Sequence, residues 1–187
     1  MANADTPFGF RPINNDMGPY TGLTRRCQIP ATNATAAVFI GDAVKLDTES
    51  AATGGYQSVD IATGGDPIYG VVTSFEANPD NLSQQYRVAS TQRFCQVALA
   101  QGNLFVVQDA AILGLAAIGA NAAFTKVAGS TVTGFSKSEL GATGTATSDS
   151  CQVVGGYDAP DNDMTLSNAL FVIKFNVSQS ADGRVGV

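Results

Sequence analysis

The sequence contains no histidine, the residue that most often acts as a catalytic base or as a zinc ligand. Ser-His and Cys-His nucleophile pairs are therefore excluded. The chain also lacks a Gly-x-Ser-x-Gly nucleophile elbow and a phosphate-binding loop. Lys137 lies between Ser136 and Ser138, but neighbouring side chains point apart along an extended chain, so a Ser-Lys dyad is not expected. We predict that the chain is not an enzyme and that it uses no cofactor.

The densest group of carboxylates is formed by Asp158, Asp161 and Asp163. Calcium favours several oxygen ligands from one flexible loop, but the segment lacks the glycine and the terminal glutamate of an EF-hand. A solvated turn is the preferred interpretation, and calcium binding at Asp158–Asp163 stays open as the alternative. We predict no metal site.

The three cysteines, Cys27, Cys95 and Cys151, are far apart and odd in number. This arrangement is neither a disulfide framework nor a set of metal ligands. Cys95 falls in an alternating apolar run, which predicts a buried thiol. The cysteines together favour a reducing compartment.

Charged residues make up 14% of the 187 residues, hydrophobic residues make up 44%, and the formal net charge is −6. Disorder couples low hydrophobicity to high net charge, so this composition indicates a folded domain. A broad nucleic-acid interface requires a basic surface, so no nucleic-acid partner is expected. No apolar run approaches the length of a membrane helix, and none near the start is typical of a signal peptide, so no membrane partner is expected either.

Alternation of apolar and polar residues dominates the chain. In residues 169–178, Phe171, Ile173 and Phe175 fall on one face and Lys174 on the other, which is typical of a half-buried antiparallel strand. Residues 93–99 follow the same pattern. Weaker strand signals cover 37–40, 43–46, 56–61, 68–76, 104–108, 131–135 and 152–157.

Glycine-rich turns separate these runs, as at Gly41-Asp42, Gly54-Gly55, Gly64-Gly65 and Gly102-Asn103. Helix signals are weak: Asp109 could cap a short helix that Gly114 interrupts, and residues 136–139 suffice for one turn. The predicted fold class is therefore all-β, an antiparallel β-barrel or sandwich with at most short helices.

The start of the chain has a different character. Pro7 and Pro12 fix the backbone and flank Phe8, Phe10 and Arg11, which predicts an extended strip that cannot bury its own two aromatic rings. The strip either folds back onto its own domain or docks on another subunit, and docking is the preferred interpretation. We predict an extended N-terminal arm over 1–25, a β-rich domain over 26–178 that could divide near 109, and a tail over 179–187. Because residues 1–13 precede all the alternating segments, we expect the β-rich domain to stay folded when they are removed.

Tyr56, Tyr69 and Tyr86 fall in or beside predicted strands. Packing in the core or across strands is the preferred interpretation. A platform for sugar binding stays open as the alternative.

Three groups of residues carry a family resemblance. The first is Met1-Ala-Asn followed by Pro7-Phe8-Gly9-Phe10-Arg11-Pro12. The second is Gly41-Asp42-Ala43-Val44 followed by Gly70-Val71-Val72. The third runs from residues 133–140 through Val153-Val154-Gly155 and 160–163 to 172–176. Together they resemble the capsid decoration (cement) proteins of tailed bacteriophages.

The resemblance implies an all-β decoration domain, often a homotrimer, on the outer surface of the capsid in the virion, made in the cytoplasm of the host bacterium. It implies the major capsid protein as partner, a role in bridging capsomers, and no catalytic residues. The capsid or subunit interface is expected at Pro7, Phe8, Phe10, Arg11 and Pro12. The alternatives are another phage component, such as a tail or adaptor protein, and a carbohydrate-binding or hydrolytic surface protein.

Overall fold

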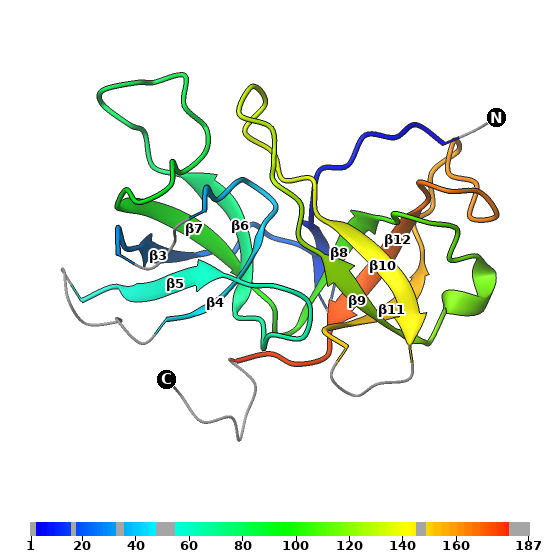
Figure 1. The fold of residues 1–187 in the computed structure, drawn as a ribbon. Helices are drawn as coiled ribbons and strands as arrows, with labels where there is room; N and C mark the ends of the chain where they lie inside the picture. The colour runs from blue at the N-terminus through cyan, green and yellow to red at the C-terminus, as the bar shows by residue number, and fades with distance from the viewer. Residues whose placement is uncertain (1–2, 16–17, 33–35, 48–54, 145–148, 180–187) are drawn as a thin grey trace.

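The computed structural model describes residues 3–15, 18–32, 36–47, 55–144 and 149–179. The described residues form twelve strands and one short 3₁₀ turn, η1, with no α-helix among them, and Figure 1 shows the two β-structures that they build. The all-β prediction is confirmed. The strands are β1 (Arg11–Asn15), β2 (Gly18–Pro19), β3 (Arg25–Ile29), β4 (Ala43–Leu46), β5 (Gln57–Ile61), β6 (Gly70–Phe75), β7 (Arg93–Leu99), β8 (Asn103–Gln108), β9 (Asn121–Thr125), β10 (Glu139–Gly144), β11 (Cys151–Gly156) and β12 (Leu170–Phe175), and η1 covers Leu115–Ala117.

Five strands close into a barrel in the order β3-β5-β4-β6-β7, in which only the β3–β5 pair is parallel. The other seven form an antiparallel sheet in the order β10-β9-β11-β12-β8-β1-β2. Along the chain, the boundary between barrel and sheet therefore falls between β7 and β8. The first two strands, β1 and β2, precede the barrel strands but belong to the sheet.

The core of the barrel and the core of the sheet meet at β6 and β7, because these strands contribute buried side chains to both. Val72 and Val97 point into the barrel, whereas their neighbours Val71 and Ala98 join the core of the sheet. Alternate residues of a strand lie on opposite faces, so the neighbouring apolar residues Val71-Val72 and Val97-Ala98 can each serve both cores. The aromatic residues Phe105 and Phe175 lie in the sheet core, with ring centroids 5.1 Å apart.

The strongest alternating segments became strands as predicted. Residues 93–99 coincide with β7, and Phe171, Ile173 and Phe175 of β12 are buried while Lys174 is exposed. The predicted strand at 131–135 is wrong, because Thr131–Thr133 form a turn and Gly134 has a positive φ of 75°. Residues 37–40 form two isolated bridges, at Val38 and Ile40, in place of a strand.

Helical structure is even shorter than the sequence predicts. Leu113 donates its backbone N–H to Asp109 Oδ2 at 3.2 Å, as in a helix start, but Gly114 at a φ of +69° interrupts the turn. The chain beyond Gly114 forms only the three residues of η1 before it turns toward β9. The single turn predicted at 136–139 is absent, because that segment is extended and leads into β10.

The described residues of the predicted arm, 3–15 and 18–25, do not form a separate arm. Arg11–Asn15 form β1, which pairs with β8 from Arg11↔Val106 to Asn15↔Asn103, and Phe10 is 2% exposed. The interpretation of this segment as a strip that the core does not need is therefore wrong. A strand inside a sheet exchanges backbone hydrogen bonds with its neighbour, and removing it would leave β8 unpaired on that side over these residues.

Candidate functional site

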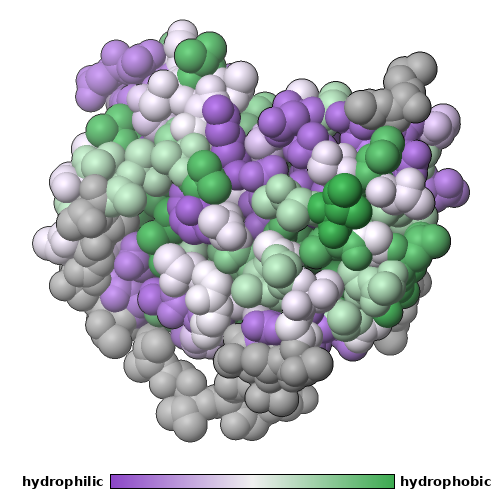
Figure 2. All heavy atoms as spheres, turned by 45° about the vertical axis from the view of Figure 1, so that its right-hand side comes forward, coloured by the Kyte–Doolittle hydropathy of each residue, from purple (hydrophilic) through white to green (hydrophobic). Residues whose placement is uncertain are grey.

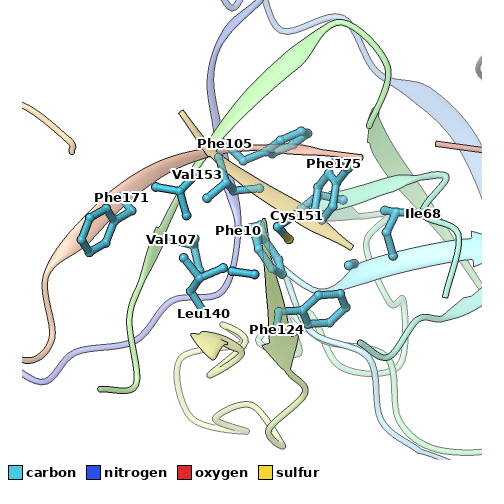
Figure 3. Close-up of a cluster of buried hydrophobic side chains, with 14 of the residues drawn as sticks. Phe10, Ile68, Phe105, Val107, Phe124, Leu140, Cys151, Val153, Phe171 and Phe175 are labelled. Atoms are coloured by element: carbon cyan, nitrogen blue, oxygen red, sulfur yellow. The ribbon is translucent and has the colours of Figure 1, made fainter. Parts of the chain in front are cut away.

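Phe10 lies in the hydrophobic core of its own chain. Its ring makes an edge-to-face contact with Phe124 and a tilted contact with Phe175, both with centroids 5.2 Å apart. Figure 3 shows the ring pointing into the cluster that also holds Val107 and Leu140. Phe10 therefore cannot serve as an anchor on another subunit, and its predicted role at an interface is corrected to one in folding.

The other four predicted interface residues remain at the surface. Pro7, Phe8 and Pro12 are half-buried and Arg11 is exposed. The Arg11 guanidinium lies over the Phe8 ring, 4.6 Å from its centroid, a geometry that favours a cation–π attraction. No ion pair joins Arg11 to a carboxylate among the described residues.

Two glycines let this segment cross the barrel. Gly9 and Gly41 have φ angles of +74° and +92°, and Phe10 N–H donates to the Gly41 carbonyl at 2.9 Å. A Cβ on Gly9 would lie 2.6 Å from the Cβ of Ser136, and a Cβ on Gly41 would collide with the Phe8 carbonyl. Both the conformation and the close approach therefore require glycine.

Asp42, next to this crossing, is buried and holds several elements together. Its Oδ2 accepts the Phe39 backbone N–H at 2.9 Å and the Lys126 ammonium at 3.2 Å, and its Oδ1 accepts the Ser136 hydroxyl at 2.6 Å. Burial raises the pKa of Asp42, while Lys126, Ser136 and Phe39 oppose that rise. The contacts fix the 126–138 loop against the Gly41 turn.

The sequence did not reveal this role of Asp42. Its only signal was a single carboxylate flanked by apolar residues, Ile40 and Ala43 among them. A carboxylate in such a run requires buried partners. Those partners, Lys126 and Ser136, lie more than eighty positions further along the chain.

A groove of about 550 Å³ runs between the Phe8–Pro12 segment and the barrel. Phe8 and Phe135 line both this groove and a neighbouring one of about 540 Å³. Four of the five predicted interface residues border the first groove and Pro7 borders the second, so the structure brings them together around a surface. The first groove is lined by Phe8, Phe10, Arg11, Pro12, Tyr20, Gly22, Thr24, Ile40, Gly41, Val72, Thr73, Ser74, Gln96 and Phe135.

Two long loops project at the end of the molecule where the groove lies. One follows β6 over 76–92 and the other covers 126–138, and Figure 1 shows both extending beyond the barrel and the sheet. Each loop carries an exposed apolar side chain, Leu82 at 79% and Val132 at 93% of full exposure. Binding residues lie on loops more often than on the elements that the loops connect, so Leu82 and Val132 are candidates for a contact surface.

A second apolar surface surrounds η1. Ile112, Leu115, Ile118 and Val154 are all exposed, by 44% to 63%. The Gly119 N–H donates to the Val153 carbonyl at 2.8 Å, which places the η1 segment beside β11. Figure 2 brings this side forward and shows hydrophobic side chains gathered among polar ones. We call these four residues the η1 patch.

The residues considered for chemistry do not converge. Ser136 and Ser138 are buried on Asp42, whereas Lys137 is exposed on the other side of the chain, as the alternation predicted. Asp158, Asp161 and Asp163 are exposed, and Thr165 hydrogen bonds lower the pKa of Asp163. Among the described residues no three metal-ligating side chains of His, Cys, Asp or Glu form a group.

The tyrosines occupy three different surroundings. Tyr69 is buried in the barrel and Tyr86 stacks on Phe39 at 5.1 Å, so packing, the preferred interpretation, is confirmed for both. Tyr56 lies at the surface against Phe94, with Arg26 held between their rings and Glu76. The Arg26 guanidinium therefore covers ring faces of Tyr56 and Phe94.

The cysteines are buried with free thiols. Cys27 and Cys95 are direct partners in the β3–β7 register, a juxtaposition that their spacing along the chain did not show. Burial raises the pKa of Cys27 to about 11, which keeps its thiol protonated and unreactive at neutral pH.

No family model, curated protein or solved structure matches this chain. In the part of the chain that the structure describes, no helix is long and apolar enough to cross a membrane. The arguments about function therefore start from the surfaces described above.

Proposed function

We propose that this chain is a structural protein of a tailed-bacteriophage virion that binds the outer surface of the capsid and stabilises it by bridging capsomers. The observation that carries the proposal is the end of the molecule that combines the groove of Phe8, Arg11 and Phe135 with two projecting loops, each with an exposed apolar side chain. The sequence resemblance to capsid decoration proteins supplies the partner.

The surface suits attachment to a protein shell. Leu82 and Val132 can each bury apolar area at about 25 cal/mol per Å², a small gain for one contact. Many copies on one shell, each bridging two capsomers, would add such gains through effective concentration. Attachment by several modest contacts needs no catalytic constellation and no cofactor.

The proposal includes assembly as a homotrimer, and the η1 patch is the surface that we assign to contacts between subunits. Apolar side chains that are exposed in one subunit and buried in an oligomer are typical of permanent interfaces. A cyclic trimer uses two different faces of each subunit. The η1 patch supplies one apolar face of that kind.

The deciding experiment measures the protein in purified virions. We expect a copy number close to that of the major capsid protein and density on the outside of the shell in a particle map. A few copies per particle, located at the portal or tail, would support the alternative of a tail or adaptor component. Absence from virions together with binding on a glycan array would favour a carbohydrate-binding protein.

Paired variants separate the two surfaces. Leu82→Ser with Val132→Ser should lower occupancy on particles that lack the native copy, without changing the oligomer measured by light scattering. Ile112→Ser with Leu115→Ser should reduce the trimer to smaller species. If the loop-tip variant decorates particles as well as the wild type does, the loops are not the attachment surface.

A further inference from the structure

One wall of the groove is an open strand edge. The pairing of β6 with β4 covers Gly70 and Val71, and two backbone hydrogen bonds extend it to Val72. Beyond that point no strand pairs with Thr73–Phe75 on the β4 side, as far as the described residues show. An unpaired edge offers backbone donors and acceptors to a further strand.

The opposite wall carries a positive charge without a carboxylate partner. Arg11 is exposed, lies over Phe8 and faces the groove that Thr73 and Ser74 line from the other side. The guanidinium has five N–H donors arranged to match a carboxylate in a bidentate pair. With a formal net charge of −6, an unpaired arginine in an apolar groove is a specific feature of this surface.

The lining of the groove includes both apolar and polar side chains. Phe8, Ile40 and Phe135 supply apolar surface, whereas Ser74 and Gln96 supply small polar groups. Thr24 donates to Gln96 Oε1 at 3.1 Å, and this bond orients the amide so that its NH2 group can donate to an incoming carbonyl. A groove with an open strand edge and both apolar and polar side chains in its lining suits an extended peptide, whose side chains point alternately to either side.

We propose that this groove binds an extended, acidic segment of the capsid protein, which adds its backbone to the open edge of β6 and places an Asp or Glu carboxylate on Arg11. This inference rests on the proposed function, because it takes the capsid protein as the partner. The charge complementarity of Arg11 selects the carboxylate, and the open edge selects the extended conformation. The Phe8 ring lies against one face of the Arg11 guanidinium and shields that face from water, which strengthens the ion pair.

The test uses overlapping synthetic peptides that tile the major capsid protein of the same virion, with binding followed by fluorescence anisotropy. We expect one acidic segment to bind the full-length wild-type protein. Arg11→Glu should weaken that segment about tenfold or more, since a bidentate pair between charged groups contributes more than the free energy of one tenfold step. Lys174→Glu, the same charge reversal on β12 outside the groove, should leave binding unchanged.

A second measurement addresses the backbone. Two versions of the bound peptide are compared, with the backbone nitrogens methylated at odd positions in one register and at even positions in the other. Methylation should abolish binding in one register and leave it in the other, because only one set of N–H groups faces a strand edge. Binding should also slow hydrogen exchange of the amides in 73–75. Equal loss in both registers would contradict addition to β6.

The outcomes distinguish the two proposals. If the wild-type protein fails to bind capsids, the proposed function is wrong. If it decorates capsids while Arg11→Glu decorates them equally well and no acidic peptide binds, the groove inference is overturned and the proposed function stands.

Discussion

Two phenylalanines separated by one glycine have different roles in this protein. Gly9, at a φ of +74°, turns the backbone so that Phe8 stays at the surface under Arg11 while Phe10 enters the core. In a regular extended strip, residues two apart would share a face. The sequence pattern therefore predicted a common role, and the glycine between the rings is the physical reason that the prediction fails for Phe10.

Phe10→Ala should lower the free energy of unfolding by about 3–5 kcal/mol, because it removes a buried ring and leaves a cavity beside Phe124 and Phe175. Phe8→Ala, the matched change at the surface, should cost much less and should instead lower capsid occupancy. Urea denaturation of both variants measures the difference. Equal stabilities would show that the Phe10 ring is not part of the folded core.

At the scale of elements, the barrel and the sheet are joined where the Phe8–Phe10 segment crosses the Gly41 turn. Phe10 N–H bonds to the Gly41 carbonyl, Gly41 N–H to the Val72 carbonyl at 2.8 Å, and Asp42 receives Lys126 and Ser136 from the 126–138 loop. The crossing therefore couples β1, β6 and the loop that carries Phe135, three of the elements that line the groove.

Gly41→Ala should destabilise the protein more than Gly22→Ala does. Both glycines have a positive φ, +92° and +78°, so each substitution carries the strain of a left-handed residue, about 1–3 kcal/mol. Gly22 has open space around it, whereas a Cβ on Gly41 collides with the Phe8 carbonyl. Thermal melting of the two variants gives the comparison, and similar melting temperatures would mean that the crossing adapts without cost.

The sequence predicted those elements whose side chains differ strongly between faces. In β7 and β12, bulky apolar residues alternate with polar ones, so both elements and their buried residues could be inferred. The sequence does not predict β9 and β10, because Asn121–Thr125 and Glu139–Gly144 consist largely of alanine, glycine and threonine, which give little hydrophobic contrast. It predicts an arm in place of β1, because the partner strand β8 lies about ninety positions away and pairing over that distance leaves no local signal.

The candidate site was predictable only in part, for a similar reason. The Pro7–Pro12 segment marked four of its surface residues, but Phe135, Thr73 and Ser74 reach the groove through the fold alone. Phe135 lies in the 133–140 segment of the family resemblance, but nothing in that segment places it beside Thr73 and Ser74. The groove and the contacts of Asp42 arise from the tertiary structure, and no spacing along the chain predicts them.

At the scale of the whole molecule, the carboxyl groups divide by the direction of their pKa shifts. Burial raises the pKa values of Asp42, Asp109 and Glu139. Hydrogen bonds from Arg26 and from Thr165 lower the pKa values of Glu76 and Asp163. Groups of the first kind favour folding when protonated, and groups of the second kind favour folding when ionised.

These opposite shifts predict a stability maximum at mildly acidic pH. Between the ordinary carboxyl pKa of about 4 and the raised values, the folded protein holds protons that the unfolded chain has released, so the free energy of unfolding falls as pH rises. Below about pH 4, Glu76 and Asp163 become protonated and lose the interactions that favour their ionised forms. The free energy of unfolding then falls again. We expect the melting temperature to rise as pH decreases from neutral toward the ordinary carboxyl pKa of about 4, and to drop at pH values below it.

Calorimetry over this pH range, at low protein concentration because the sequence pI is about 4.4, measures the effect. Relief of the net negative charge acts in the same direction, but about 1 M salt screens exposed charges over a few ångströms and leaves a group as buried as Asp42 largely unscreened. The rise should therefore persist in high salt. In Asp42→Asn it should become smaller, even though that variant is less stable at every pH because an amide nitrogen cannot accept the bonds that a carboxylate oxygen accepts from Phe39 and Lys126. A rise that disappears in salt and is unchanged in Asp42→Asn would assign the pH dependence to surface charge instead of to the buried carboxyl groups.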